Sequence, residues 1–286
     1  MIHQYKSNGY NIVMDVESGA VHVVDDVTYD VIALFEDTEI SKIVEQLSDK
    51  YDKADIEEAI SEVNQLKEDG QLFTQDIYQP FIEEFKDKRQ TVVKALCLHI
   101  AHDCNLACKY CFAEEGEYHG RRAMMSFEVG KKALDFLVAN SGSRVNLEVD
   151  FFGGEPLMNW DVVKQLVEYG RSLEEPYHKK FRFTLTTNGV LLNDEIMEYL
   201  NKEMSNVVLS LDGRKEVNDR MRPFRTGKGS YDLIVPKFQK LAESRNQSNY
   251  YVRGTFTRDN LDFSEDVKHF ADLGFKQMSI EPVVGP

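Results

Sequence analysis

Three cysteines stand close together in the run HDCNLACKYCF. They are Cys104, Cys108 and Cys111, with three and then two residues between them. Thiolates are soft ligands for zinc or iron-sulfur clusters, and a structural zinc ion normally takes a fourth ligand close by. Three thiolates on so short a loop suit a [4Fe-4S] cluster better, with one iron left without a protein ligand. Half of a zinc site and a redox sensor remain as alternatives.

A second motif, FFGGEPL, contains Gly153, Gly154 and Glu155. Glycine has no Cβ, so two glycines in a row let the backbone come close to a ligand, and their carbonyl groups can accept hydrogen bonds from an ammonium group. A side chain at Gly154 is therefore expected to weaken ligand binding while leaving the iron content nearly unchanged. The same run could also be an ordinary turn.

Two further motifs bring short polar side chains together. TTNG contains Asn188, and SLDG contains Ser210 and Asp212. Hydroxyl, amide and carboxylate groups of this kind can hydrogen-bond a ribose or an amino acid. Arg222, in NDRMRPF, and Arg253, in YYVRGTF, offer the guanidinium fork that suits a carboxylate, although each could equally form a structural ion pair.

These motifs fall within residues 95–286, where strand and helix patterns alternate. Strands are expected over 96–101, 145–152, 182–187, 207–211, 251–257 and 277–282. Helices are expected over 127–139, 160–173, 195–203, 231–242 and 264–273. The alternation predicts an α/β fold with parallel strands, a partial (β/α)6 barrel that falls short of an eight-stranded one. Reactive groups of such barrels lie at the carboxyl ends of the strands, where each motif falls.

The first part of the chain, residues 1–73, predicts a separate small domain. Its stretches YNIVMDV and AVHVVDD alternate as strands of a hairpin. Helices are expected after the hairpin, over 28–35, 40–51 and 56–66. Asp55 is the expected cap of the third helix and Gly70 its stop. The arrangement predicts a winged-helix-like fold, and residues 74–94, which contain Pro80, are expected to form a bridge.

Charge and composition limit the partners. The net charge is -15 and the pI about 5.0, which disfavours binding to nucleic acid. The third predicted helix, IEEAISEVNQLKED, is acidic where a DNA-reading helix needs Arg, Lys or Asn. Acidic residues are concentrated over 36–69, which is typical of a solvated helical face and only weakly indicates a basic peptide partner.

Several features indicate a cytoplasmic protein. No apolar run is long enough to span a bilayer, and the start MIHQYKSNGY lacks a hydrophobic signal segment, so we expect no membrane partner. Four cysteines, three of them in one loop, do not form a secreted disulfide framework. The fourth, Cys97, lies in the apolar run ALCLHI and is expected to be a buried strand residue.

The cysteine spacing followed by the aromatic Phe112, together with FFGGEP, resembles the signature of radical S-adenosylmethionine (SAM) enzymes. The resemblance implies that the amino and carboxylate groups of SAM occupy the open iron. The reduced cluster then cleaves SAM to methionine and a 5'-deoxyadenosyl radical, which abstracts a hydrogen atom from an unactivated carbon. No P-loop or HExxH run competes with this interpretation.

The resemblance also implies roles for the strand-end residues. The GGEP segment would contact the methionine amino group, and Ser210 and Asp212 would lie near the ribose or the methionyl part of SAM. Asn188 would belong to the same binding site. Arg222 or Arg253 would bind the SAM carboxylate.

Two aromatic residues flank Cys111 on either side. Tyr110 and Phe112 could each stack on the adenine of SAM, or be ordinary core residues.

The N-terminal arrangement resembles the peptide-recognition element of enzymes that modify ribosomally made peptides, in which a leader peptide adds as a strand to the hairpin edge. The chain as a whole resembles a radical SAM peptide maturase of the six-cysteines-in-forty-five class, which joins a cysteine sulfur of a precursor peptide to a threonine carbon. This implies a precursor peptide as partner and an electron donor such as ferredoxin or flavodoxin. The alternative for the N-terminal part is a stabilising cap.

Other functions remain open at this point. Another radical SAM activity, such as anaerobic sulfatase maturation or a molybdenum-cofactor type cyclisation, shares the cysteine loop and GGEP. A non-catalytic peptide-binding scaffold with a structural metal is a third hypothesis. Members of the resembling group carry a C-terminal SPASM domain with auxiliary clusters, and four cysteines are too few for it. We therefore expect the sequence to be the N-terminal part of a longer protein.

Overall fold

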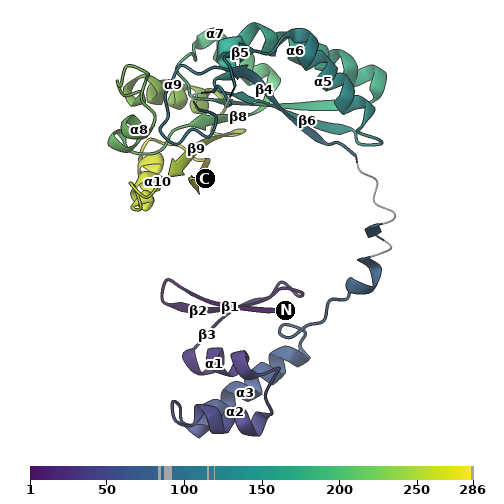
Figure 1. The fold of residues 1–286 in the computed structure, drawn as a ribbon, viewed down its shortest axis with the longest axis vertical. Coiled ribbons are helices and arrows are strands. Elements are labelled where there is room, and N and C mark those ends of the chain that lie inside the picture. Colours follow the sequence, from purple (N-terminus) through teal and green to yellow (C-terminus); the bar gives the residue numbers. More distant parts are fainter. Residues whose placement is uncertain (83–84, 87–91, 115, 119, 285–286) are drawn as a thin grey trace. The chain divides into compact units, whose positions relative to one another are not determined.

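The computed structural model of the chain describes residues 1–82, 85–86, 92–114, 116–118 and 120–284. It divides into two compact units, Met1–Gln90 and Thr91–Pro286 (Figure 1). Part of the predicted bridge, residues 83–84 and 87–91, lies outside the described residues. No helix among the described residues is long and apolar enough to cross a membrane.

The first unit is built on an antiparallel sheet of three strands with β2 in the middle. The strands are β1 (Ile2–Ser7), β2 (Tyr10–Asp15) and β3 (Val21–Val24). The predicted hairpin is present as β2 and β3. β1 was not predicted, because it is an edge strand whose residues do not alternate clearly between apolar and polar.

Three helices pack on this sheet around one apolar core. They are α1 (Asp26–Leu34), α2 (Ile40–Leu47) and α3 (Lys53–Glu68). The core includes Val13 of β2, Val31 of α1 and Ile56 of α3, all fully buried. The expected cap at Asp55 is wrong, because α3 begins earlier, after Asp52. Gly70 adopts a left-handed conformation just after the helix, with φ of +67°. Glycine favours this conformation, and the predicted end of the helix at Gly70 is confirmed.

The second unit is a seven-stranded sheet in the order β10-β9-β8-β7-β6-β4-β5. Its strands are β4 (Ala95–His102), β5 (Ala123–Met124), β6 (Asn146–Gly153), β7 (Lys180–Thr187), β8 (Met204–Ser210), β9 (Tyr250–Phe256) and β10 (Met278–Pro282). All neighbours are parallel except β5, which pairs antiparallel with β4 at the edge. The mixed α/β fold with a parallel sheet is thus confirmed.

Helices alternate with these strands along the chain (Figure 1). They are α5 (Phe127–Ala139), α6 (Trp160–Tyr177), α7 (Asp194–Glu203), α8 (Lys215–Met221), α9 (Tyr231–Ser244) and α10 (Phe263–Asp272). Short 3-10 helices, η1 (Gln79–Phe81) and η2 (Pro156–Asn159), complete the described elements. β5, α8 and the 3-10 helices were not predicted, since each is too short to show a periodic pattern.

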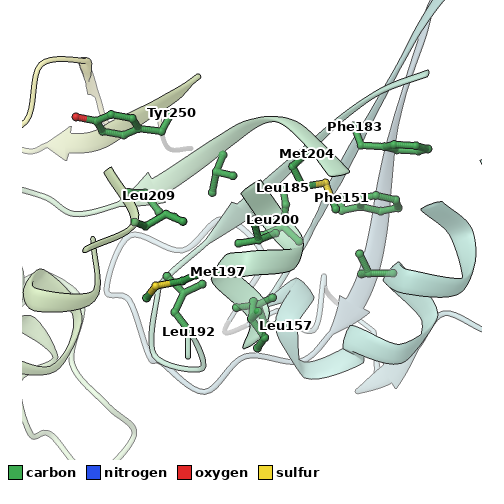
Figure 2. Close-up of a cluster of buried hydrophobic side chains, with 14 of the residues drawn as sticks. Phe151, Leu157, Phe183, Leu185, Leu192, Met197, Leu200, Met204, Leu209 and Tyr250 are labelled. Atoms are coloured by element: carbon green, nitrogen blue, oxygen red, sulfur yellow. The ribbon is translucent and has the colours of Figure 1, made fainter. Parts of the chain in front are cut away.

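The core of the second unit lies between the sheet and its helices. Figure 2 shows large side chains of the strands meeting those of the neighbouring helices and turns: Phe151, Leu157, Phe183, Leu185, Leu192, Met197, Leu200, Met204, Leu209 and Tyr250. The ring of Phe183 stacks on that of Phe151, with centroids 5.6 Å apart. Residues between these on each strand point to the opposite face of the sheet.

Cys97 lies on that opposite face. It is a residue of β4, as predicted, but it is exposed rather than buried. Its neighbour Leu98 points into the helix-covered core instead. An apolar run does not reveal which alternate residues face the covered side of a strand, and the prediction of a buried thiol is wrong for this reason.

Replacing Phe183 with Ala should destabilise the second unit by roughly 3–5 kcal/mol, because it removes a fully buried ring from between two layers. Phe136→Ala is the matched control, since Phe136 on α5 is exposed and should change stability by no more than about 0.5 kcal/mol. Urea unfolding followed by circular dichroism measures both. Equal midpoints for the two variants would contradict the assignment of this core.

Candidate functional site

The cysteine loop follows β4 and is held by main-chain hydrogen bonds to the end of α8 and the segment that follows it. Ala107 N–H donates to Pro223 O at 2.8 Å, and Lys109 N–H donates to Met221 O at 2.9 Å. The guanidinium of Arg225 donates to Cys104 O at 2.8 Å and to Asp103 Oδ1 at 2.9 Å. The sequence did not predict the two main-chain hydrogen bonds, because main-chain pairing leaves no side-chain signature.

The three thiols are free of disulfides. Burial, with the charge of Glu155, raises the pKa of Cys104 to about 12, and burial also raises the pKa of Cys108. The thiolate forms of Cys104 and Cys108 are therefore disfavoured unless a positive centre binds them. Two nitrogens, Leu106 N and Asn188 Nδ2, each lie 3.5 Å from Cys104 Sγ, and N–H groups that face ligand sulfurs are a feature of iron-sulfur sites.

Among the described residues, no three His, Cys, Asp or Glu side chains form a ready-made group around one metal ion. The fit of a cluster therefore rests on the thiols and their N–H neighbours.

Gly153 and Gly154 are required by the protein's own backbone. A Cβ at Gly153, where φ is +132°, would lie 2.5 Å from Ala101 O. A Cβ at Gly154 would lie 2.0 Å from Asp103 O, beside the first cysteine. Gly154 N–H donates to Ala101 O at 2.7 Å, so the end of β6 is joined to the start of the cysteine loop. The expectation that a side chain at Gly154 would spare the iron content is therefore corrected.

Glu155 is buried and its carboxylate is fully engaged. It accepts hydrogen bonds from Leu157 N at 3.0 Å, Thr187 Oγ1 at 2.9 Å and Asn188 N at 2.8 Å. Burial raises its pKa to about 6, although these three donors oppose the shift. Its carboxylate thus fixes the end of β7, and through it the amide of Asn188, which donates to Asn105 Oδ1 at 2.7 Å.

A second buried network lies behind the loop. Tyr110 Oη donates to Asp212, with both carboxylate oxygens 2.8 Å away, and Arg222 Nη1 donates to Tyr110 Oη at 2.6 Å. Arg222 also lies 3.8 Å from Asp212, which accepts from Thr255 N at 3.2 Å. Burial raises the pKa of Asp212 against the opposing charge of Arg222. Asp212 therefore connects the cysteine loop to the ends of β8 and β9.

These elements surround a cavity of about 290 Å³ at the carboxyl ends of the parallel strands. It is lined by all of the predicted site residues except Asp212, which is fully buried behind it: Cys104, Cys108, Cys111, Tyr110, Phe112, Gly153, Gly154, Glu155, Asn188, Ser210, Arg222 and Arg253. Phe112 is 65% exposed at its rim. The cavity is also lined by Thr186, Thr255 and Glu281, which the sequence analysis did not predict as site residues. Their positions near the ends of predicted strands, close to the motifs, were the signal that could have identified them.

The two candidate arginines differ in their surroundings. Arg253 Nη2 lies 2.6 Å from Glu281 Oε2 on the neighbouring strand, and the pair is half-exposed. Arg222 is buried, lines the cavity, and its Nε has no hydrogen-bond partner among the described residues. A buried guanidinium N–H without an acceptor beside three thiols fits a site that receives a negatively charged ligand group.

Gly154→Ala should lower the iron content after anaerobic reconstitution severalfold, because the added Cβ must displace the backbone next to Cys104. Gly120→Ala is the matched control, since its Cβ would meet nothing closer than 3.4 Å. Iron and sulfide assays on both variants, with circular dichroism to verify folding, give the answer. Wild-type iron content in folded Gly154→Ala would show that this contact does not shape the loop.

The comparisons with known proteins agree with this geometry. The model of the Radical SAM superfamily matches residues 98–280. The uncharacterized protein MJ0907 of Methanocaldococcus jannaschii is 30% identical over 191 residues, which are 66% of this chain and 62% of that relative. The chain therefore spans less than two thirds of the relative's length.

Two solved structures have a similar fold. The structure of anSMEcpe with bound AdoMet and the Kp18Cys peptide has a TM-score of 0.61 and 21% identity, over 68% of this chain and 52% of that chain. The structure of Streptococcus suis SuiB bound to S-adenosylmethionine has a TM-score of 0.51 and 17% identity, over 100% of this chain and 63% of that chain.

The match to the superfamily model covers the cysteine loop, the glycine motif and the parallel strands from residue 98 in β4 to residue 280 in β10. It confirms the prediction that the cofactors are SAM and a [4Fe-4S] cluster. The chain belongs to the radical SAM superfamily of enzymes.

Proposed function

We propose that this chain is the catalytic and recognition part of a radical SAM maturase that modifies a ribosomally made precursor peptide. The observation that carries the proposal is the pairing of two units in one chain. One holds the cysteine loop in a cavity at the strand ends, and the other presents an open sheet edge suited to a peptide strand. The SuiB structure aligns with both units.

In the catalytic unit, the bound cofactors supply a 5'-deoxyadenosyl radical. The residues of the chain bind and orient. Cys104, Cys108 and Cys111 would hold the cluster, and the Gly153–Gly154 backbone would contact the methionyl end of SAM. Arg222 is the better placed of the two arginines for the SAM carboxylate, because its Nε lacks an acceptor whereas Arg253 is paired with Glu281. Glu155, in the cavity wall, and Asp212, behind it, act as positioning residues.

In the N-terminal unit, the winged-helix-like arrangement acts as the leader-peptide recognition domain. β3 is an edge strand, and its Val21 and Val23 are 59% and 65% exposed. A leader peptide that adds beside β3 gains main-chain hydrogen bonds and covers these two side chains. The acidic face of α3 favours a leader with basic residues.

The finer reaction follows from the resemblance to the six-cysteines-in-forty-five class, of which the thermocellin maturase is an example. A cysteine sulfur of the precursor is joined to a threonine carbon. An electron donor such as ferredoxin or flavodoxin reduces the cluster. Anaerobic sulfatase maturation is the alternative reaction. Mass spectrometry distinguishes them, because thioether formation removes two hydrogen atoms per link and leaves the sulfur in the product.

Replacing Cys104, Cys108 and Cys111 together with Ala should abolish iron binding and reductive SAM cleavage, because the cluster loses all its protein ligands. Cys97→Ala is the matched control, since Cys97 lies on β4 outside the loop. Iron assay and chromatography of 5'-deoxyadenosine measure the two effects. Persistent SAM cleavage in the triple variant would refute the site.

The double variant Val21→Thr and Val23→Thr should weaken binding of a labelled leader peptide about tenfold, because it replaces two apolar side chains on β3 while keeping their shape. Val129→Thr, an exposed position on α5, is the control. Fluorescence anisotropy of the labelled leader peptide provides the measurement. If the affinity for the leader peptide is unchanged, the recognition role of β3 is wrong and the N-terminal unit is a stabilising cap.

A further inference from the structure

Asp150 is a partly buried carboxylate that the proposed chemistry does not use. It lies on β6 between Val149 and Phe151, both of which point into the helix-covered core. Asp150 therefore points to the opposite face of the sheet. Its Oδ1 is buried and has no hydrogen-bond partner among the residues that the structure describes.

The surroundings of Asp150 come from three other strands, β4, β7 and β9. Its register partners are Cys97 on β4 and Thr184 on β7. Burial raises the pKa of Asp150 to about 6, while the charge of Arg253 on β9 opposes the shift. Burial raises the pKa of Cys97 and of Tyr251, and the negative charge of Asp150 adds to both shifts.

The cavity shows how the sheet is shaped. β9 is separated from β6 by two other strands, β7 and β8, yet Phe152 of β6 and Arg253 of β9 both line the cavity. The sheet therefore curves so that side chains of β6 and β9 face a common space. Arg253 belongs to the cavity wall and is paired with Glu281 on β10.

Asp150 lies directly below the cofactor cavity. Phe152, the next residue of β6 on the same face, lines the cavity together with Arg253. Asp150 itself does not line the cavity, but it lies two residues before Phe152 on the same face of β6. At neutral pH a carboxylate with this pKa is mainly ionised, and an ionised acceptor without a donor is costly to bury.

Two other carboxylates near the site differ from Asp150, because each has partners within the chain. Glu155 has the same raised pKa but receives three hydrogen bonds from the chain. Glu148, two residues earlier on β6, pairs with Lys94 at 3.2 Å. Asp150 alone of the three has an oxygen that is buried and unsatisfied in the described part of the chain.

We propose that Asp150 is a substrate-binding residue that accepts a hydrogen bond from a backbone N–H of the peptide segment under modification. This inference rests on the proposed function, because it takes a peptide as the substrate. An extended peptide supplies N–H donors along its length, and a charge-assisted hydrogen bond to Asp150 fixes its register beside the cofactors.

The test compares Asp150→Asn with wild type and with Glu148→Gln as the matched control. The probe is an acetylated and amidated octapeptide of glycine and threonine with one central cysteine, titrated by calorimetry into reconstituted, SAM-bound enzyme. A second probe is the same peptide with methylated backbone nitrogens. We expect Asp150→Asn to bind the first peptide at least tenfold more weakly, Glu148→Gln to match wild type, and the methylated peptide to bind wild type and Asp150→Asn equally.

Stability gives an independent measurement. The pKa of about 6 lies above the ordinary aspartate value of 3.8, so the folded state binds the proton more tightly than the unfolded chain. The contribution of Asp150 to stability therefore falls as the pH rises from about 4 to 6. Asp150→Asn should remove this dependence and keep or raise the melting temperature at pH 7.5, with unchanged iron content and SAM affinity.

The outcomes separate the two proposals. Equal affinity of wild type and Asp150→Asn for the unmethylated peptide overturns the role of Asp150 and leaves the proposed function intact. A lower melting temperature of Asp150→Asn, with weaker binding of both peptides, also overturns it, because the residue is then structural. Absence of any octapeptide binding by wild type overturns the inference, and the separate measurement of leader-peptide affinity then decides the proposed peptide substrate.

Discussion

The close approach of β6 to the start of the cysteine loop is the contact on which the catalytic unit depends. Gly153 and Gly154 lie so near Ala101 and Asp103 that any Cβ would collide with main-chain atoms. Gly116 closes the same contact from the other side, since its Cβ would lie 2.9 Å from Asp103 C and 3.0 Å from Gly154 Cα. Three backbone segments therefore meet where the first thiol must be placed.

Around this contact, buried polar groups determine the geometry. Glu155 orders the end of β7, and Asp212 with Tyr110 and Arg222 connects the loop to β8 and β9. Buried networks of this kind add little net stability, but they penalise every alternative arrangement in which a partner is lost. The cavity thus owes its shape to side chains that lie beneath its surface as well as to those that line it.

The sequence predicted the parallel strands and the cysteine loop because both have strong local signals. α5 begins and ends where its periodicity indicates, and Ser126 caps it. The roles of Glu155 and Asp212 could not be predicted, since a motif shows that a carboxylate is present but not which donors will surround it. β1 was missed for a related reason, because an edge strand is specified mainly by main-chain pairing.

The hydrogen bonds from the cysteine loop to residues 221–225 bear on the order in which the holoenzyme assembles. In small zinc domains the metal is needed for folding, so apoprotein and chain disorder go together. Here Ala107 and Lys109 are bound by main-chain carbonyls of another segment, independently of any ligand on the thiols. The loop therefore has support from the rest of the unit besides the cluster, and we expect less of the fold to depend on the metal than in a zinc domain.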